Sequence, residues 1–290
     1  MPPLLALFTA NPTLEMLRAA AATLSAFFRA SPFPAVDPDI PVLALLLRLN
    51  HCDDALKSAV VVVSNLSGGS NSETIQRICH SEIISALVSL FQHSTALIQR
   101  EALGTIFNIV AALDSQHTQI VVENGVLPGL FRLLTNTEDS EVMKKICQIV
   151  FNIAVLDRSS VIESGITKHI IHLLNLNDTE IKTYALRTIF TITSEQNHDH
   201  IRLLVSQGCI EGLSNVLDPT EGDIVLAALG VLEVIFEVET NGGGEDFPYR
   251  RMFIQAGGLQ QMDEAVFTHA DDHDINLRYD RIIMGYFKDS

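Results

Sequence analysis

The phrase Phe107-Asn108-Ile109 recurs along this chain about every 40 residues. It is preceded by Ser64-Asn65-Leu66 and followed by Phe151-Asn152-Ile153 and Phe190-Thr191-Ile192, at spacings of 43, 44 and 39 residues. A period of this length is typical of stacked helical repeats, in which no unit has a complete core of its own. The repeat therefore predicts an all-α solenoid, a class of protein that usually holds other chains along a groove.

The composition excludes several classes of function. Hydrophobic residues make up 47% of the chain and tryptophan is absent, so the core must be aliphatic. Nineteen basic and 35 acidic side chains give a formal charge of −16, which repels nucleic acid and attracts basic peptides. The acids also serve solubility, and the sequence leaves both roles open. No apolar run reaches the roughly 18 residues of a membrane span, and Met1-Pro2-Pro3 lacks the basic region of a signal peptide.

One repeat is clearest between Gln119 and Asp157. Its short first helix stops at Gly125, because glycine can take the positive φ of a sharp turn. A second helix follows at 127–134, and Ser140 is the expected N-cap of a long third helix. Short, medium and long helices, with a glycine between the first two, describe an armadillo repeat.

The same layout predicts a right-handed superhelical solenoid of about six to seven armadillo repeats, a single domain over 1–290. Turn glycines are expected at Gly165, Gly208 and Gly257, and Glu82 takes the corresponding place in another unit. The expected units are 1–30, 38–69, 75–114, 118–157, 160–197, 200–240 and 249–288, with a flexible loop at 241–247. The first of them would hold a second helix near 4–10 and a third helix near 13–29.

The side chains that could carry chemistry are scattered. The four cysteines, expected to be reduced and mostly buried, are Cys52, Cys79, Cys147 and Cys209. His198-Asp199-His200 and the stretch 269–274 fall in turns, where solvated loops are expected rather than metal ligands. No acid–base pair or nucleophile arrangement is recognisable. We therefore expect a protein that is not an enzyme and that uses no metal and no cofactor.

Four stretches carry a family resemblance. They are 64–69; 107–110 with Gln116 and 119–121; 29–34 with 43–49; and a tail made of Pro248-Tyr249, 255–259, 273–275 and Gly285-Tyr286-Phe287. In order and spacing they resemble the importin-α family, the adaptors that carry cargo with nuclear localisation signals. The tail is the most specific, because it is similar to the family's final repeat. The resemblance covers essentially the whole chain and the C-terminal two-thirds of a typical member.

In that family each third helix presents Trp and Asn four residues apart on a concave face. The Asn amides bond to the main chain of an extended peptide, and the Trp rings stack on Lys or Arg stems. The corresponding pairs here are Ala22 and Ala26, Val61 and Asn65, Gly104 and Asn108, Gln148 and Asn152, Arg187 and Thr191, and Gly230 and Val234. The resemblance thus implies a degenerate peptide site at Asn65, Asn108, Gln148, Asn152, Arg187 and Thr191. Asn108 and Asn152 correspond to the family's minor groove.

The resemblance implies a nuclear import adaptor that binds basic nuclear-localisation-signal peptides or proteins in the cytoplasm and the nucleus. The C-terminal unit, 253–287, would engage an export receptor, as the family's end does. The family's basic N-terminal segment has no counterpart here, so importin-β binding is not expected. No nucleic acid and no membrane are expected as partners.

Interpretations without nuclear-signal binding remain open beside this one. The chain is alternatively a general armadillo scaffold that has lost nuclear-signal recognition, or a fragment with exposed apolar surface at Leu4, Leu5 and Leu7. The asparagines would then only cap or solvate helix faces. The acids near third-helix starts would serve the helix dipole; they are Glu101, Glu138, Asp139, Glu141, Asp178 and Glu180. Acids that face the asparagines would favour the adaptor.

Overall fold

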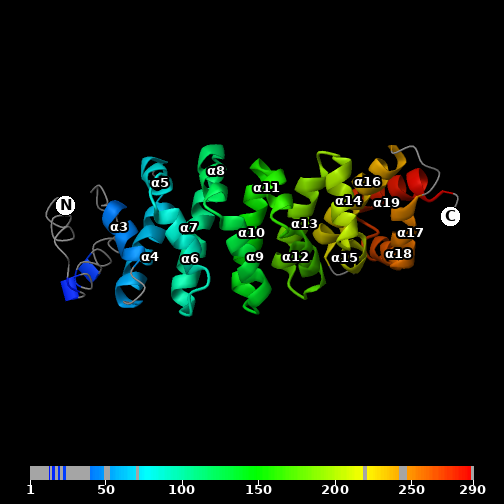
Figure 1. The fold of residues 1–290 in the computed structure, drawn as a ribbon. Helices are drawn as coiled ribbons and strands as arrows, with labels where there is room; N and C mark the ends of the chain where they lie inside the picture. The colour runs from blue at the N-terminus through cyan, green and yellow to red at the C-terminus, as the bar shows by residue number, and fades with distance from the viewer. Residues whose placement is uncertain are drawn as a thin grey trace. The chain divides into compact units, whose positions relative to one another are not determined.

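The computed structural model describes residues 40–48, 53–69, 72–217, 221–241 and 247–288, together with Thr13, Glu15, Met16, Ala19, Ala22 and Thr23. Every regular element in these ranges is helical, as Figure 1 shows. The predicted all-α class is thus confirmed. Four predictions fall outside the described residues: the helix near 4–10, most of the helix near 13–29, the buried thiol of Cys52, and residues 242–246 of the expected loop.

The chain divides into two compact units, unit 1 with residues 1–156 and unit 2 with residues 157–290. The described helices of unit 1 are α3 (Ile40–Leu47), α4 (Asp53–Gly68), α5 (Ser72–Cys79), α6 (Ile83–Leu90), α7 (Ala96–Ala111), α8 (Ser115–Glu123), α9 (Val126–Asn136) and α10 (Ser140–Leu156). Those of unit 2 are α11 (Arg158–Glu163), α12 (Thr167–His172), the 3-10 helix η1 (Leu173–Asn175), α13 (Thr179–Thr193), α14 (His198–Ser206), α15 (Cys209–Asn215), α16 (Gly222–Asn241), α17 (Pro248–Gln255), α18 (Gly258–Thr268) and α19 (His273–Tyr286).

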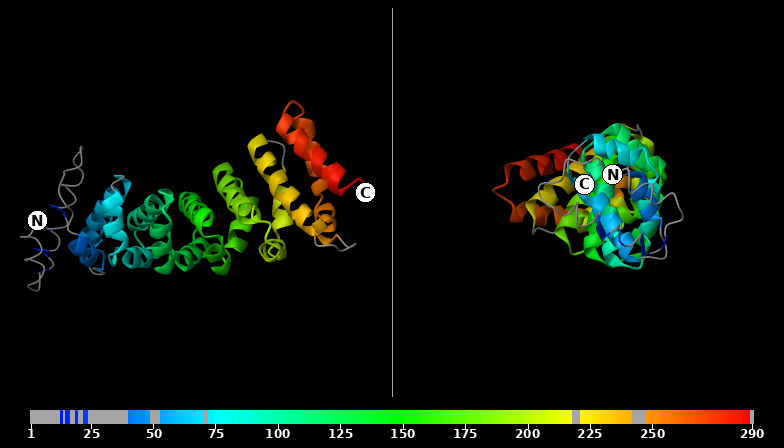
Figure 2. Two further views of the ribbon diagram at one scale, coloured as in Figure 1. Left: turned by 90° about the horizontal axis from the view of Figure 1, so that it is seen from above. Right: turned by 90° about the vertical axis from the view of Figure 1, so that its left-hand side faces the viewer.

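The long helices are the third helices of the repeats, and they pack on one another within each unit. In unit 1, α7 packs between α4 and α10, and in unit 2, α16 packs between α13 and α19. Figure 2 shows the ribbon from two further directions. Their buried sides are aliphatic. On α10, for example, Val142, Ile146 and Ile153 are at most 1% exposed. Each such side chain contributes about 1.5–3 kcal/mol through burial.

Four of the turns between first and second helices depend on glycine. Gly125, Gly165, Gly208 and Gly257 have φ values of 79°, 74°, 91° and 76°, in the left-handed region that side chains with a Cβ avoid. The predicted turn glycines are thus confirmed. Glu82 makes the α5–α6 turn with an ordinary φ of −76°, so the same connection forms without glycine in that repeat.

The prediction that Ser140 caps α10 is wrong. The Asp139 carboxylate accepts hydrogen bonds from the backbone N–H groups of Glu141 at 3.0 Å and Val142 at 3.3 Å. Asp139 is therefore the N-cap, because its side chain reaches the N–H groups two and three residues ahead, whereas Ser140 is already helical. Other third and first helices begin in the same way, with side-chain caps at Asp114, Asp157, Asp178, Asn197 and Asp272.

Unit 2 ends in an aromatic cluster held by one arginine. The Phe236 ring centroid lies 5.5 Å from that of Phe253 and 5.3 Å from that of Phe287. The Arg250 guanidinium lies 3.9 Å from the centroid of the Phe247 ring, and its Nε is 3.3 Å from Glu239 Oε2. The Glu239 side chain is only 4% exposed. Arg250 thus ties the end of α16 to α17 beside the cluster.

The described cysteines, Cys79, Cys147 and Cys209, are buried free thiols, as predicted. Burial raises the pKa of Cys79 and of Cys209 to about 12, so neither thiol ionises near neutral pH. Within the described ranges, no three His, Cys, Asp or Glu side chains come together as a metal site would require. Those ranges also contain no helix with both the length and the apolar character needed to cross a membrane.

Candidate functional site

The six predicted contact residues all lie on third helices, and we call them the ladder. Asn65 is on α4, Asn108 on α7, Gln148 and Asn152 on α10, and Arg187 and Thr191 on α13. Arg187 is exposed and the other five are half-buried. The first four belong to unit 1 and the last two to unit 2.

Asn108 contacts the preceding third helix directly. Its Nδ2 donates to the Ser67 hydroxyl at 3.0 Å and to the Ser64 carbonyl oxygen at 3.4 Å, both on α4. Ser67 in turn donates to the same Ser64 carbonyl at 2.7 Å. Because the amide nitrogen is used inside the protein, the amide oxygen of Asn108 is the atom left to accept a hydrogen bond from a ligand.

An open pocket of about 450 Å³ lies beside Asn108. The C-terminal ends of α4 and α7 line it together with the first turns of α5 and α8, the latter through Asp114 and His117. Asp114 Oδ1 accepts from the His117 backbone N–H at 2.9 Å, while its carboxylate stays 47% exposed. The C-terminal ends of helices carry partial negative charge. The N-terminal ends of α5 and α8 carry the opposite partial charge, so the exposed carboxylate of Asp114 is the group through which this pocket suits a cationic side chain.

Gln148 and Asn152 are the next ladder residues and lie on α10. The side of the third helices that bears the ladder, which we call the ladder face, also carries a cation there. Gln148 Oε1 is buried without a hydrogen-bond partner among the described residues. One turn before it, Lys145 places its Nζ 4.0 Å from the centroid of the Phe107 ring on α7. Burial lowers the pKa of Lys145, and the charge of Glu141 opposes that effect.

In unit 2 the ladder residues Arg187 and Thr191 already make contacts within the protein. The Arg187 guanidinium lies 5.6 Å from the Tyr184 ring centroid. The Thr191 hydroxyl donates to the Arg187 carbonyl at 2.8 Å, and the Thr191 carbonyl accepts from Arg158 Nε at 2.8 Å. Thr191 therefore has fewer hydrogen-bonding groups available to a peptide than an asparagine would have, since its one side-chain donor is used internally.

At the next pair of family positions, Gly230 and Val234 on α16, a cation from α19 lies over Gly230. Arg278 Nη1 lies 3.2 Å from the point where a Cβ on Gly230 would stand. The same Nη1 donates to Glu233 Oε2 at 2.8 Å. The guanidinium thus fills the space left by the missing side chain and neutralises the acid next to it.

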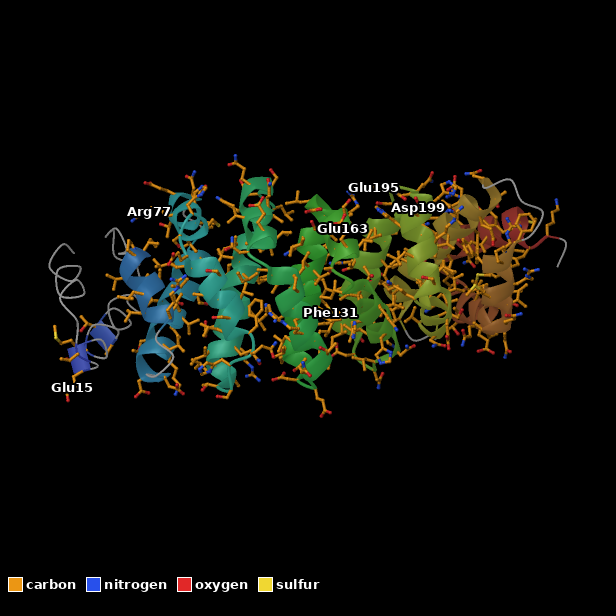
Figure 3. The ribbon with its side chains drawn as sticks, in the orientation of Figure 1. Glu15, Arg77, Phe131, Glu163, Glu195 and Asp199 are labelled. Carbon is orange, nitrogen blue, oxygen red and sulfur yellow. The ribbon has the colours of Figure 1, made fainter. Side chains whose placement is uncertain are left out.

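Three of the six acids near the third-helix starts have structural contacts. Asp139 pairs with Arg100 at 2.7 Å and caps α10, Asp178 caps α13, and Glu141 pairs with Lys144 at 3.0 Å. The structural interpretation is confirmed for Asp139 and Asp178. Figure 3 shows Glu163, Glu195 and Asp199 along one edge of unit 2. Glu195 pairs there with Arg158 at 2.8 Å.

Sequence reasoning missed the residues that surround the ladder. Ser67, Phe107 and Lys145 in unit 1, and Arg278 in unit 2, were not among the candidates. Their contacts join different helices, so no local pattern reveals them. Asp114 did leave a signal, because an aspartate just before a predicted first helix is a typical N-cap close to the end of the preceding third helix.

Comparisons with known proteins agree with this architecture. The Armadillo/beta-catenin-like repeat model matches residues 71–111. A designed armadillo repeat protein in complex with the peptide (KR)4 superimposes with a TM-score of 0.67, at 23% identity over 83% of this chain and 97% of that chain. An engineered protein superimposes with a TM-score of 0.71, at 21% identity over 97% of this chain and 66% of its own.

Curated relatives match over nearly the whole chain. Importin subunit alpha-1b of Oryza sativa subsp. japonica is 35% identical over 97% of this chain and 53% of its own length. Importin subunit alpha-3 of Arabidopsis thaliana is 35% identical over 98% of this chain and 54% of its own length. The chain thus spans about half the length of these relatives. Its fold is that of armadillo-repeat proteins, and its sequence is similar to those of importin α subunits.

Proposed function

We propose that this chain binds extended basic peptides along its third helices and serves as an adaptor for cargo with nuclear localisation signals. The proposal is of a binding protein rather than an enzyme. Two comparisons support it: the relatives are importin subunits, and a designed protein of the same fold is in complex with the peptide (KR)4. The formal charge of −16 also favours a basic partner over a nucleic acid.

The observation that carries the proposal is the pocket beside Asn108. A basic side chain entering it meets the exposed carboxylate of Asp114. The main chain of the same peptide can donate an N–H to the Asn108 amide oxygen, since the amide nitrogen is bonded to Ser67. One residue thus fixes the peptide backbone while the adjacent pocket selects a positive charge.

The finer assignments belong to the same proposal. Asn65, Gln148 and Asn152 would continue the main-chain contacts on the other third helices of unit 1. An export receptor would engage the C-terminal unit, 253–287, and the protein would work in the cytoplasm and the nucleus. Importin-β binding is not part of the proposal.

A second candidate function is a general scaffold for other proteins. It is favoured by the ladder of unit 2, where Thr191 is bonded internally and Arg278 covers Gly230. On this view the third helices hold the fold together, and a partner binds elsewhere.

Fluorescence anisotropy separates the two candidates. A labelled nuclear-localisation-signal peptide of the basic type is titrated at low and at physiological salt. The variants are Asn108→Ala and Asn152→Ala, with Asn124→Ala as control, because Asn124 is a half-buried asparagine whose side chain donates to the Ile120 carbonyl of its own helix, α8. We expect binding that weakens with salt, and losses of about two- to tenfold for each ladder variant.

The control variant should bind as the wild type does. Equal losses in all three variants would point to a general effect on stability rather than to a ladder contact. No binding by a well-folded protein would overturn the adaptor function and leave the scaffold.

A further inference from the structure

The contact between Lys145 and Phe107 joins two third helices on the ladder face of unit 1. Lys145 is on α10 and Phe107 on α7, both half-buried, with 4.0 Å between the ammonium nitrogen and the ring centroid. A cation within about 6 Å of an aromatic centroid is attracted by the ring quadrupole. The protein therefore stacks one of its own cations on a ring of the proposed peptide-binding face.

This ring lies between residues assigned to the peptide. Phe107 is adjacent to Asn108, and Lys145 lies one helical turn before Gln148. A peptide that bonds to Asn108 and Gln148 therefore passes the Phe107 ring. A lysine or arginine at that point would meet a ring face already covered, and an ammonium of like charge.

The neighbouring Lys144 shows that charge alone does not define this contact. Lys144 is also half-buried on α10, but its Nζ pairs with Glu141 Oε1 at 3.0 Å. Removing either lysine changes the net charge of the protein by the same amount. Only Lys145 stacks on the Phe107 ring, so the two residues form a matched pair for experiment.

Unit 2 has a related arrangement. Arg278 covers Gly230 and binds Glu233, so in that repeat a cation of the chain occupies the place of the family's aromatic side chain. Two of the positions where a basic peptide would be expected to stack are thus filled from within the protein.

We propose that Lys145 is a specificity-determining residue of the ladder, which excludes a basic peptide side chain from the Phe107 ring by occupying that ring itself. This inference rests on the proposed function. Where other positions of the face take lysine or arginine, the position at Phe107 takes a residue without positive charge. The protein would then bind a basic peptide more weakly than the same face would with the ring uncovered.

A double-mutant cycle tests this inference with fluorescein-labelled (KR)4 as the probe. Anisotropy gives the Kd for the wild type, Lys145→Gln, Lys144→Gln, Phe107→Leu and the double variant Lys145→Gln/Phe107→Leu. We expect Lys145→Gln to tighten binding about three- to tenfold, because the freed ring can stack on a peptide cation. Lys144→Gln should tighten it less than about twofold, because Lys144 frees no ring when it is removed and its charge is already paired with Glu141.

Phe107→Leu in the Lys145→Gln background should remove the gain. Equal gains for the two lysine variants, or a gain that survives the loss of the ring, would overturn the inference while leaving the proposed function intact. No binding by the wild type or by any folded variant would overturn the proposed function, and this inference with it. Thermal unfolding of each variant checks that differences in Kd do not come from unfolding.

Discussion

Asn108 on α7 donates a 3.0 Å hydrogen bond to the Ser67 hydroxyl on α4, so a residue of the proposed peptide site also joins two third helices. Ser67 is 3% exposed, which means that its hydroxyl has little access to water. Losing this bond therefore leaves a poorly hydrated polar group behind. Binding and stability should be linked at this position.

Asn108→Ala should lower the free energy of unfolding by about 1–2 kcal/mol, because it removes the bonds to Ser67 and to the Ser64 carbonyl. Urea denaturation followed by circular dichroism measures the change. Ser67→Ala should destabilise by a similar amount, and the double variant by less than the sum of the two. Strict additivity would mean that the two side chains do not interact in solution.

Arg250→Ala should lower the free energy of unfolding by about 3 kcal/mol, because it leaves the Glu239 carboxylate buried without its charged partner. Arg202→Ala is the control, since its ion pair with Asp199 is exposed and should contribute less than about 0.5 kcal/mol. Adding Glu239→Gln to Arg250→Ala should recover part of the loss. Equal melting temperatures for the two arginine variants would contradict the role of Arg250.

Gly258→Ala should destabilise unit 2 by about 1–3 kcal/mol through overpacking. A Cβ at Gly258 would stand 2.2 Å from Cε2 of Phe253, a ring that is fully buried. The contrast is Gly285→Ala on α19, where a Cβ would meet nothing within 4 Å. That variant should keep or slightly raise the melting temperature, because alanine favours helix more than glycine does. Similar losses for both would exclude the steric explanation.

Asp139→Asn should show a pH-dependent effect on stability. The hydrogen bond from Arg100 is the main reason that the pKa of Asp139 lies below its ordinary value of 3.8. A lowered pKa in the folded state means that the carboxylate contributes stability above that ordinary value and loses it as the pH falls. Asparagine caps a helix about as well as aspartate, so this variant isolates the charge.

The wild type should therefore be slightly more stable than Asp139→Asn at pH 7, and the difference should shrink below about pH 4. Thermal unfolding from pH 2 to pH 7 measures it. The effect is small because both partners of the ion pair are exposed. A difference that stays constant across this range would show that the carboxylate charge has no part in it.

The class of fold could be predicted because local signals recur about every 40 residues along the chain. Apolar spacing within one helix and a glycine at each sharp turn are both readable from a few neighbouring residues, as Gly125 and Gly208 illustrate. The cap of α10 was missed by one residue, since Asp139 and Ser140 are both good N-caps and only the backbone conformation decides between them.

The site was less predictable, because its chemistry depends on pairs of helices. The positions of Asn65, Asn108, Gln148 and Asn152 on third helices follow from the repeat. Their partners do not. Whether Asn108 faces Ser67, and whether Lys145 reaches the Phe107 ring, depends on the register between neighbouring helices, which no local pattern of residues specifies.

The turn at Glu82 has a practical consequence for studying this protein. Since its φ is −76°, any L-residue fits there without backbone strain, whereas a side chain at Gly125 would be forced into the left-handed region. Glu82 is exposed, and its ion pair with Arg48 is solvent-accessible on both sides. Glu82→Cys therefore offers an attachment point for a fluorophore within residues 71–111, the very repeat that the armadillo model matches, without disturbing its turn.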